Sequence, residues 1–151
     1  MLLKMTGHSY RFECENLCRV FFPYSPVRVA EVTEPGPGEP WAEAAMEEGG
    51  AGWAYAVRAS DGERELSRTF TAPEREEYHM TRLLFDALSE LTGIRPAWGM
   101  LTGVHPVKLL RQHVERLGPG AGTEDFREKW LVSEARTELA GRVLRAQRQA
   151  V

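Results

Sequence analysis

Hydrophobic residues recur at helical spacing in two stretches of the N-terminal 93 residues. From residue 10 to 21 the apolar positions fall at offsets of 0, 4, 7, 8 and 11, and from residue 80 to 91 at offsets of 0, 3, 4, 7, 8 and 11. Each series lies on one face of an α-helix. Gly93 supplies a stop for the second helix. The two faces consist of Tyr10, Cys14, Leu17, Cys18 and Phe21, and of Met80, Leu83, Leu84, Ala87, Leu88 and Leu91.

Strand patterns lie before and between these helices. Residues 2–6 form a short apolar run, and the β-branched Val27, Val29 and Val32 predict a second strand. Residues 53–58 and 66–70 alternate between apolar and polar on either side of a turn signal, which predicts a hairpin.

Two connecting segments complete this region. Residues 34–52 are rich in Pro, Gly, Ala and Glu without a clear period, so we expect a long acidic loop. Thr71-Ala72-Pro73-Glu74 has the form of a capping box and predicts the start of the second helix. The element order predicts an α+β fold in which residues 1–93 form a two-layer α/β sandwich with a mainly antiparallel sheet.

Residues 94–151 have only helical patterns and predict a separate C-terminal helical unit. Pro106 would open one helix, and Gly118-Pro119-Gly120 would break it. Thr123 is expected to cap a second helix that runs to Trp130. Ser133 would begin the last helix, with Leu139, Val143 and Leu144 on its apolar side.

Composition and charge fit a two-part globular protein. The chain has 151 residues, with 42% apolar and 27% charged residues, enough for one ordinary core. Residues 1–94 carry 9 Lys and Arg against 16 Asp and Glu, a net charge of −7, whereas residues 95–151 carry 10 against 6, a net charge of +4. The opposite net charges suggest that the two parts contact different neighbours. The alternative is that the charge simply varies from one helix surface to the next. No apolar run is long enough to span a membrane and no leader pattern opens the chain, so we expect a cytoplasmic protein.

Metal and catalytic signatures are sparse. Cys14 and Cys18 form a C-x-x-x-C pair, but Phe21 stands where a third cluster-binding cysteine would lie. Two thiols on an apolar helix face favour core packing, with a metal site or a disulfide as alternatives. The four histidines lack zinc-binding spacing, and His105 and His113 would lie about 12 Å apart along one helix. We therefore predict no metal site and no catalytic residues in this chain.

The segment from Trp98 to Leu110 is the strongest candidate for a binding site. Two glycines precede the helix opened by Pro106, so backbone N–H groups and the positive helix end could receive a carboxylate or phosphate. The alternative is a tight turn in which the tryptophan packs the helical unit on the sheet. The candidate ligand-binding or docking residues are Trp98, Gly99, Thr102, Gly103, His105 and Lys108.

This segment resembles a motif of HemZ-type oxygen-independent coproporphyrinogen III dehydrogenases, members of the radical S-adenosylmethionine superfamily. The family pattern is roughly W-G-x-L-T-G-x-R-P-x-K-L, and His105 replaces its usual Arg. A looser similarity continues through 130–134, which look like a short step between two helices. The matching positions are Trp98, Gly99, Leu101, Thr102, Gly103, Pro106, Lys108 and Leu109.

The resemblance implies an N-terminal accessory region of a haem-biosynthesis enzyme. The full family protein would use a [4Fe-4S] cluster and S-adenosylmethionine to decarboxylate coproporphyrinogen III, and its C-x-x-x-C-x-x-C segment would follow beyond Val151. This chain alone is predicted to bind neither cofactor and to be inactive. Its expected partners are the missing radical barrel and coproporphyrinogen III.

Two other functions remain open from sequence. The chain could be a free-standing module that binds an anionic ligand at the segment from Trp98 to Lys108. Alternatively, a basic face on the last helix could attract nucleic acid, although no aromatic residues interleave with its arginines and a solvated surface explains them more simply. That face would comprise Arg136, Arg142, Arg145 and Arg148.

Overall fold

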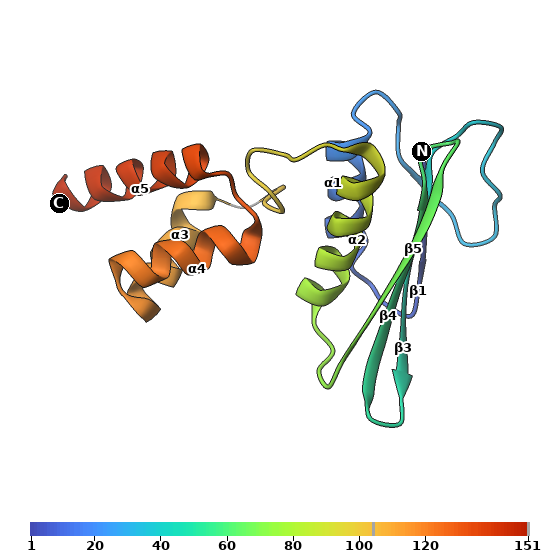
Figure 1. The fold of residues 1–151 in the computed structure, drawn as a ribbon, viewed down its shortest axis with the longest axis horizontal. Helices are drawn as coiled ribbons and strands as arrows, with labels where there is room; N and C mark the ends of the chain where they lie inside the picture. Colours follow the sequence, from blue (N-terminus) through green and yellow to red (C-terminus); the bar gives the residue numbers. More distant parts are fainter. Residues whose placement is uncertain (104, 151) are drawn as a thin grey trace. The chain divides into compact units, whose positions relative to one another are not determined.

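A computed structural model describes residues 1–103 and 105–150 of the chain. The chain divides into two compact units, Met1–Ile94 and Arg95–Val151, which we call the sheet unit and the helical unit. Each unit has its own set of elements (Figure 1).

The sheet unit is an α+β sandwich. Its five strands lie in the order β2-β1-β3-β4-β5, and its two helices lie on the same side of the sheet (Figure 1). β1 is parallel to both neighbours, whereas β3, β4 and β5 are joined by antiparallel pairing. The predicted fold class, with a mainly antiparallel sheet, is therefore confirmed. The elements are β1 (Leu2–Thr6), α1 (Arg11–Phe21), β2 (Arg28–Val29), β3 (Trp41–Gly49), β4 (Gly52–Ser60), β5 (Glu65–Ala72) and α2 (Glu77–Thr92).

The predicted apolar faces form the core of this unit. Four of the five residues predicted on the first helical face are buried in α1, while Tyr10 is its N-cap residue. On α2 the buried face includes Met80, Leu84 and Leu88, none of which is exposed. Gly93 ends α2 in the left-handed conformation, with φ of +74°, as its position predicts.

Strand β3 corrects the prediction of an acidic loop over residues 34–52. Ala42, Ala44 and Met46 alternate along β3 and are buried against the helices. Ala45, which points to the other side, pairs with Ala56 of β4. The pattern was missed because alanine occupies both faces of the strand, so the hydrophobic alternation is weak in the sequence. The second predicted strand is also shorter than its valines suggested, since β2 comprises two residues.

The capping-box prediction at residues 71–74 is wrong. Thr71 and Ala72 belong to β5, and α2 begins only at Glu77. The hydroxyl of buried Tyr55 instead organises this turn, because it donates to Glu74 O at 2.8 Å and accepts from Glu76 N at 2.9 Å. A partner from another strand thus replaces the local cap that the sequence suggested.

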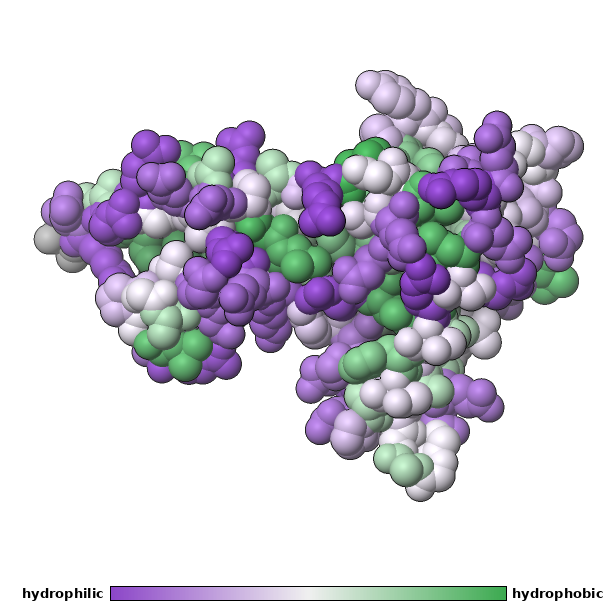
Figure 2. All heavy atoms as spheres, in the orientation of Figure 1, coloured by the Kyte–Doolittle hydropathy of each residue, from purple (hydrophilic) through white to green (hydrophobic). Residues whose placement is uncertain are grey.

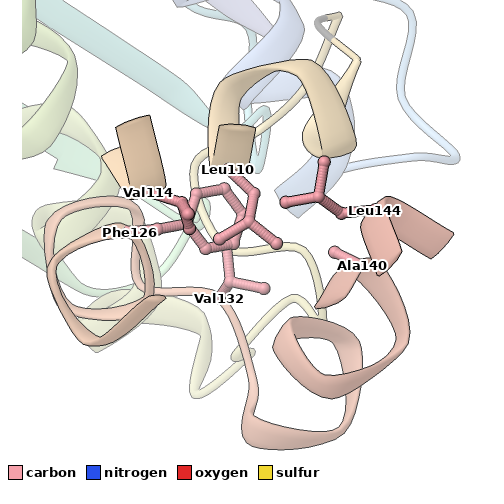
Figure 3. Close-up of a cluster of buried hydrophobic side chains, with 6 residues drawn as sticks. All are labelled: Leu110, Val114, Phe126, Val132, Ala140 and Leu144. Carbon is pink, nitrogen blue, oxygen red and sulfur yellow. The ribbon is translucent and has the colours of Figure 1, made fainter. Parts of the chain in front are cut away.

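The helical unit consists of three helices around a small apolar core. These are α3 (Pro106–Leu117), α4 (Pro119–Trp130) and α5 (Glu134–Gln149). Figure 3 shows the side chains from all three helices and from the α4–α5 connection that meet in this core. The cluster comprises Leu110, Val114, Phe126, Val132, Ala140 and Leu144.

The helical unit differs from the sequence prediction at one helix boundary and on one helix face. Gly118, with φ of +89°, joins α3 to α4, so α4 begins at Pro119 and Thr123 lies inside it rather than at its cap. On α5 the buried residues are Thr137, Ala140 and Leu144, whereas Val143 is exposed. Ser133 caps α5 as predicted, because its hydroxyl accepts from Arg136 N.

Polar side chains cover much of the visible surface of the helical unit, with smaller apolar areas between them (Figure 2). Within residues 1–103 and 105–150, none of the helices combines the length and apolar character that crossing a bilayer requires.

Candidate functional site

The first half of the candidate segment is fixed by backbone contacts with the α4–α5 connection. Met100 N donates to Trp130 O at 2.8 Å, and Ser133 N donates to Ala97 O at 2.9 Å. These bonds join residues 97–100 to residues 130–133, and we call the pair of segments the backbone clasp. The two stretches that carry the sequence resemblance therefore lie against each other.

Gly99 is required by the geometry of the backbone clasp. Its φ is +59°, and a Cβ atom built on it would lie 2.2 Å from Trp130 O and 2.3 Å from Leu131 O. Both oxygens belong to the backbone, so no side-chain rotation relieves the clash. Leu131 is itself left-handed, with φ of +58°, and it ends α4. The glycine of the motif is thus explained by packing without any ligand.

Trp98 packs within the helical unit. Its ring is half-buried against the unit's apolar cluster, and the guanidinium carbon of Arg136 lies 5.7 Å from its ring centroid. This contact engages one of the four arginines that were considered for a basic face on α5. Trp98 therefore acts as a structural residue whose indole joins the candidate segment to α5.

The second half of the segment is more accessible. Thr102 is half-buried, while Gly103, His105 and Lys108 are exposed; Val104 lies outside the described residues. His105 is the N-cap residue of α3, and no side chain caps this helix end. An exposed helix N-terminus next to a lysine suits an anion electrostatically. The anion-binding role of these residues stays a prediction.

A buried histidine network supports the fold beside this segment. His113 is 6% exposed, and its Nδ1 lies 2.7 Å from Asp125 Oδ2, while Trp130 Nε1 donates to its Nε2 at 3.0 Å. Arg116 also donates to Asp125 Oδ2, at 2.7 Å. The hydrogen bond from His113 and the nearby cations lower the pKa of Asp125.

This network favours one tautomer of the neutral His113 ring. Because Nε2 accepts a hydrogen bond, the proton of the neutral ring lies on Nδ1 and is donated to Asp125. Both ring nitrogens are therefore occupied, which leaves neither free for a metal or a substrate. Sequence spacing did not reveal this network, since Asp125 and Trp130 reach His113 only through the α3–α4 turn.

Cys14 and Cys18 are buried core residues with free thiols, in line with the favoured interpretation of their spacing. Burial raises the pKa of Cys14 to about 12, and burial likewise raises the pKa of Cys18. Thiols in such an environment stay protonated at neutral pH, whereas iron and zinc bind the thiolate. Neither cysteine thus has the character of an accessible metal ligand.

One further group of potential ligand atoms occurs in the sheet unit. Atoms of Glu74, Glu76 and His79 lie within 4.8 Å of one another at the start of α2. His79 also packs against the rings of Tyr55 and Phe70. Exposed carboxylates commonly gather in this way without an ion, so the cluster alone does not define a metal site.

No protein-family model, curated protein sequence or solved structure matches this chain. Any functional assignment therefore rests on the geometry of the chain and on the motif in residues 98–110.

Proposed function

We propose that this chain is the non-catalytic N-terminal accessory region of an oxygen-independent coproporphyrinogen III dehydrogenase of the radical S-adenosylmethionine type. The observation that supports this proposal is the backbone clasp. Two stretches chosen only for their likeness to the family, around Gly99 and around Leu131, pack against each other within hydrogen-bond distance. The two stretches thus form one structural feature, as the parts of a shared family motif would.

The chemistry of the described residues fits an accessory role. His113 has both ring nitrogens engaged, and the two cysteines are buried, which raises the pKa of their thiols. The helical unit would lead into the radical barrel, and the exposed His105 and Lys108 are the proposed docking positions beside its substrate. The cluster and S-adenosylmethionine would be held by the barrel.

The genomic sequence downstream of codon 151 provides the most direct test. We expect an open reading frame in which C-x-x-x-C-x-x-C follows within a few dozen codons. A stop codon directly after Val151 would contradict the proposal.

Reconstitution tests whether this chain alone can bind an iron–sulfur cluster. Incubation of the purified chain with iron, sulfide and reductant should yield no visible absorption of a [4Fe-4S] cluster, because both thiols are buried. A stable cluster that disappears in the Cys14→Ser variant would refute the assignment of an accessory role.

The exposed end of α3 favours a second candidate function, the binding of an anionic ligand by the chain alone. Coproporphyrin III, which carries four carboxylates, is a suitable ligand for fluorescence titration. The Lys108→Ala variant should weaken binding, whereas Arg142→Ala, which removes an exposed cation from α5, should leave it unchanged. Equal weakening by both variants would indicate a nonspecific charge effect.

A further inference from the structure

The two edges of the sheet differ in how they are protected from pairing with another chain. The strand order places β2 at one edge and β5 at the other. β2 comprises only two residues and follows Pro26, and both short length and proline keep an edge strand from pairing. β5 comprises eight residues, six of them exposed, and it pairs with β4 over its whole length without a bulge. β5 is therefore the long, open edge of this sheet.

The closing bond of the β4–β5 hairpin shows which backbone groups face this open edge. Asp61 N donates to Arg64 O at 3.2 Å. Because hydrogen-bonded and non-hydrogen-bonded pairs alternate along an antiparallel ladder, the odd-numbered residues of β5 direct their N–H and C=O groups away from β4. Thr69 and Thr71 thus present both groups to the open edge.

Two features limit this open stretch. At one end Arg68 Nη1 donates to Ser67 O at 2.7 Å, so this outward carbonyl already has a donor. At the other end Pro73 follows the strand and has no N–H group. A strand that pairs with β5 therefore finds its best partners at Thr69 and Thr71.

An exposed aromatic ring lies between these two threonines. Phe70 is opposite buried Tyr55, so it points to the side of the sheet that the helices cover. Its ring also lies against His79, with centroids 5.0 Å apart. The phenylalanine nevertheless remains 43% exposed. A long edge strand with an exposed apolar side chain is prone to pair with another strand.

We propose that β5 pairs with the β5 strand of a second copy of this chain, antiparallel and centred on Phe70. A two-fold axis at this residue places Thr69 opposite Thr71 of the second copy, so the threonines exchange backbone hydrogen bonds. The two Phe70 rings then meet at a non-hydrogen-bonded position, where side chains approach most closely. Arg68 lies opposite Ala72, so no like charges face each other. Dimerisation of this kind is independent of the proposed accessory role.

The neighbouring registers are each less favourable. An axis at Arg68 would place two guanidinium groups opposite each other. An axis at Thr69 would need the carbonyl of Ser67, which already has a donor. An axis at Thr71 would need an N–H group from Pro73. The strand is thus complementary to itself in one register, which favours a second copy as the partner.

Analytical ultracentrifugation tests this dimer. Because strand pairing buries little surface, we expect a weak equilibrium in which the average mass rises from 17.0 kDa towards twice that value between micromolar and millimolar concentration. Phe70→Lys places two ammonium groups at the axis and should raise the dissociation constant about tenfold. Phe12→Lys, at a residue of α1 that is 64% exposed, is the matched control and should not change it.

Two outcomes of this measurement would overturn the proposal. One is a mass that stays at 17.0 kDa throughout, which would leave the open edge to a strand of another protein. The other is equal weakening by both lysine variants, which would mean that added charge rather than the position of Phe70 weakens the dimer.

Cysteine cross-linking tests the register and does not require a tight dimer. In the Phe70→Cys variant the two new thiols face each other across the axis, so mild oxidation should give a covalent dimer. Ser67→Cys on the same exposed strand is the control, because its two copies would lie about 20 Å apart. The native thiols of Cys14 and Cys18 are buried and do not compete. Equal cross-linking of both variants, or none in Phe70→Cys, would overturn the assigned register.

Discussion

The two units reach a folded state by different means. The sheet unit buries apolar side chains from β1, β3, β4 and both helices, and its strands pair regularly, as Ala45 does with Ala56. The helical unit has one cluster of six buried apolar residues, and it supplements this cluster with particular polar and backbone contacts. Small units gain limited stability from apolar burial. We therefore expect single contacts to matter more in the helical unit than in the sheet unit.

The largest predicted effect is that of Gly99→Ala. The added methyl group would meet two backbone oxygens of the α4–α5 connection, and alanine disfavours φ of +59°. We expect a loss of at least about 3 kcal/mol in the unfolding free energy of the helical unit. Residue-resolved amide hydrogen exchange would measure it, with exchange in the sheet unit unchanged.

Gly120→Ala is the matched control for this glycine. Gly120 lies in the first turn of α4, and a Cβ built there has no neighbour within 4 Å. Alanine should therefore be neutral or slightly stabilising. If Gly99→Ala were equally harmless, the backbone clasp would not be a determinant of the helical unit.

His113→Phe should have the next largest effect. Phenylalanine retains a ring but neither donates to Asp125 nor accepts from Trp130 Nε1, so both of these hydrogen bonds are lost. We expect the helical unit to lose about 2 kcal/mol. The pKa of Asp125 should rise towards its ordinary value, which NMR titration would detect. His105→Phe, at an exposed cap position, serves as the control and should change stability little.

A smaller effect is expected in the sheet unit for Tyr55→Phe. The tyrosine hydroxyl bonds both Glu74 O and Glu76 N, and the ring is 1% exposed. Its removal should cost about 1 kcal/mol of unfolding free energy, measured by urea denaturation. Tyr24→Phe, in which the altered side chain is 99% exposed, should have no effect. A loss above that of His113→Phe would reverse the proposed contrast between the units.

The smallest effect concerns a surface contact and its pH dependence. Arg28 Nη2 donates to Glu39 Oε1 at 2.6 Å, and this hydrogen bond, with one from Gly36 N, lowers the pKa of Glu39 to about 2. A lowered carboxyl pKa stabilises the folded state above its ordinary value of 4.5, and this contribution disappears as the pH falls towards about 2. Solvent screening limits the contribution to about 1 kcal/mol or less.

Glu39→Gln tests this contribution. The variant should be less stable than the native protein at pH 7, and the difference should vanish near pH 2. Glu31→Gln, at an exposed position in the same connection, should show no such convergence. A difference that stays constant across this pH range would mean that the carboxylate charge does not contribute.

The sequence predicted the elements whose patterns are local and strongly periodic. The helical face that includes Leu84 and the hairpin through Tyr55 are present in the structure as expected. Strand β3 was missed because its alanines form a core only when helices cover them. The prediction of a capping box at Thr71 was wrong because Thr71 and Ala72 pair with β4 as part of β5. This strand pairing prevails over the local signal for a helix start.

The candidate site likewise combines features that the sequence reveals with features that only tertiary contacts explain. The motif drew attention to Gly99, but the reason why glycine is required there, a close approach to residues 130 and 131, depends on contacts distant in sequence. The bonds of His113 likewise arise from packing between helices. No periodicity in the chain could reveal them.

The backbone clasp also sets an order of events during translation. Residues 97–100 leave the ribosome well before residues 130–133, with which they pair. The sheet unit, whose last helix ends at Thr92, is by then completely synthesised. The helical unit therefore reaches its final arrangement only after the nascent chain has passed Ser133.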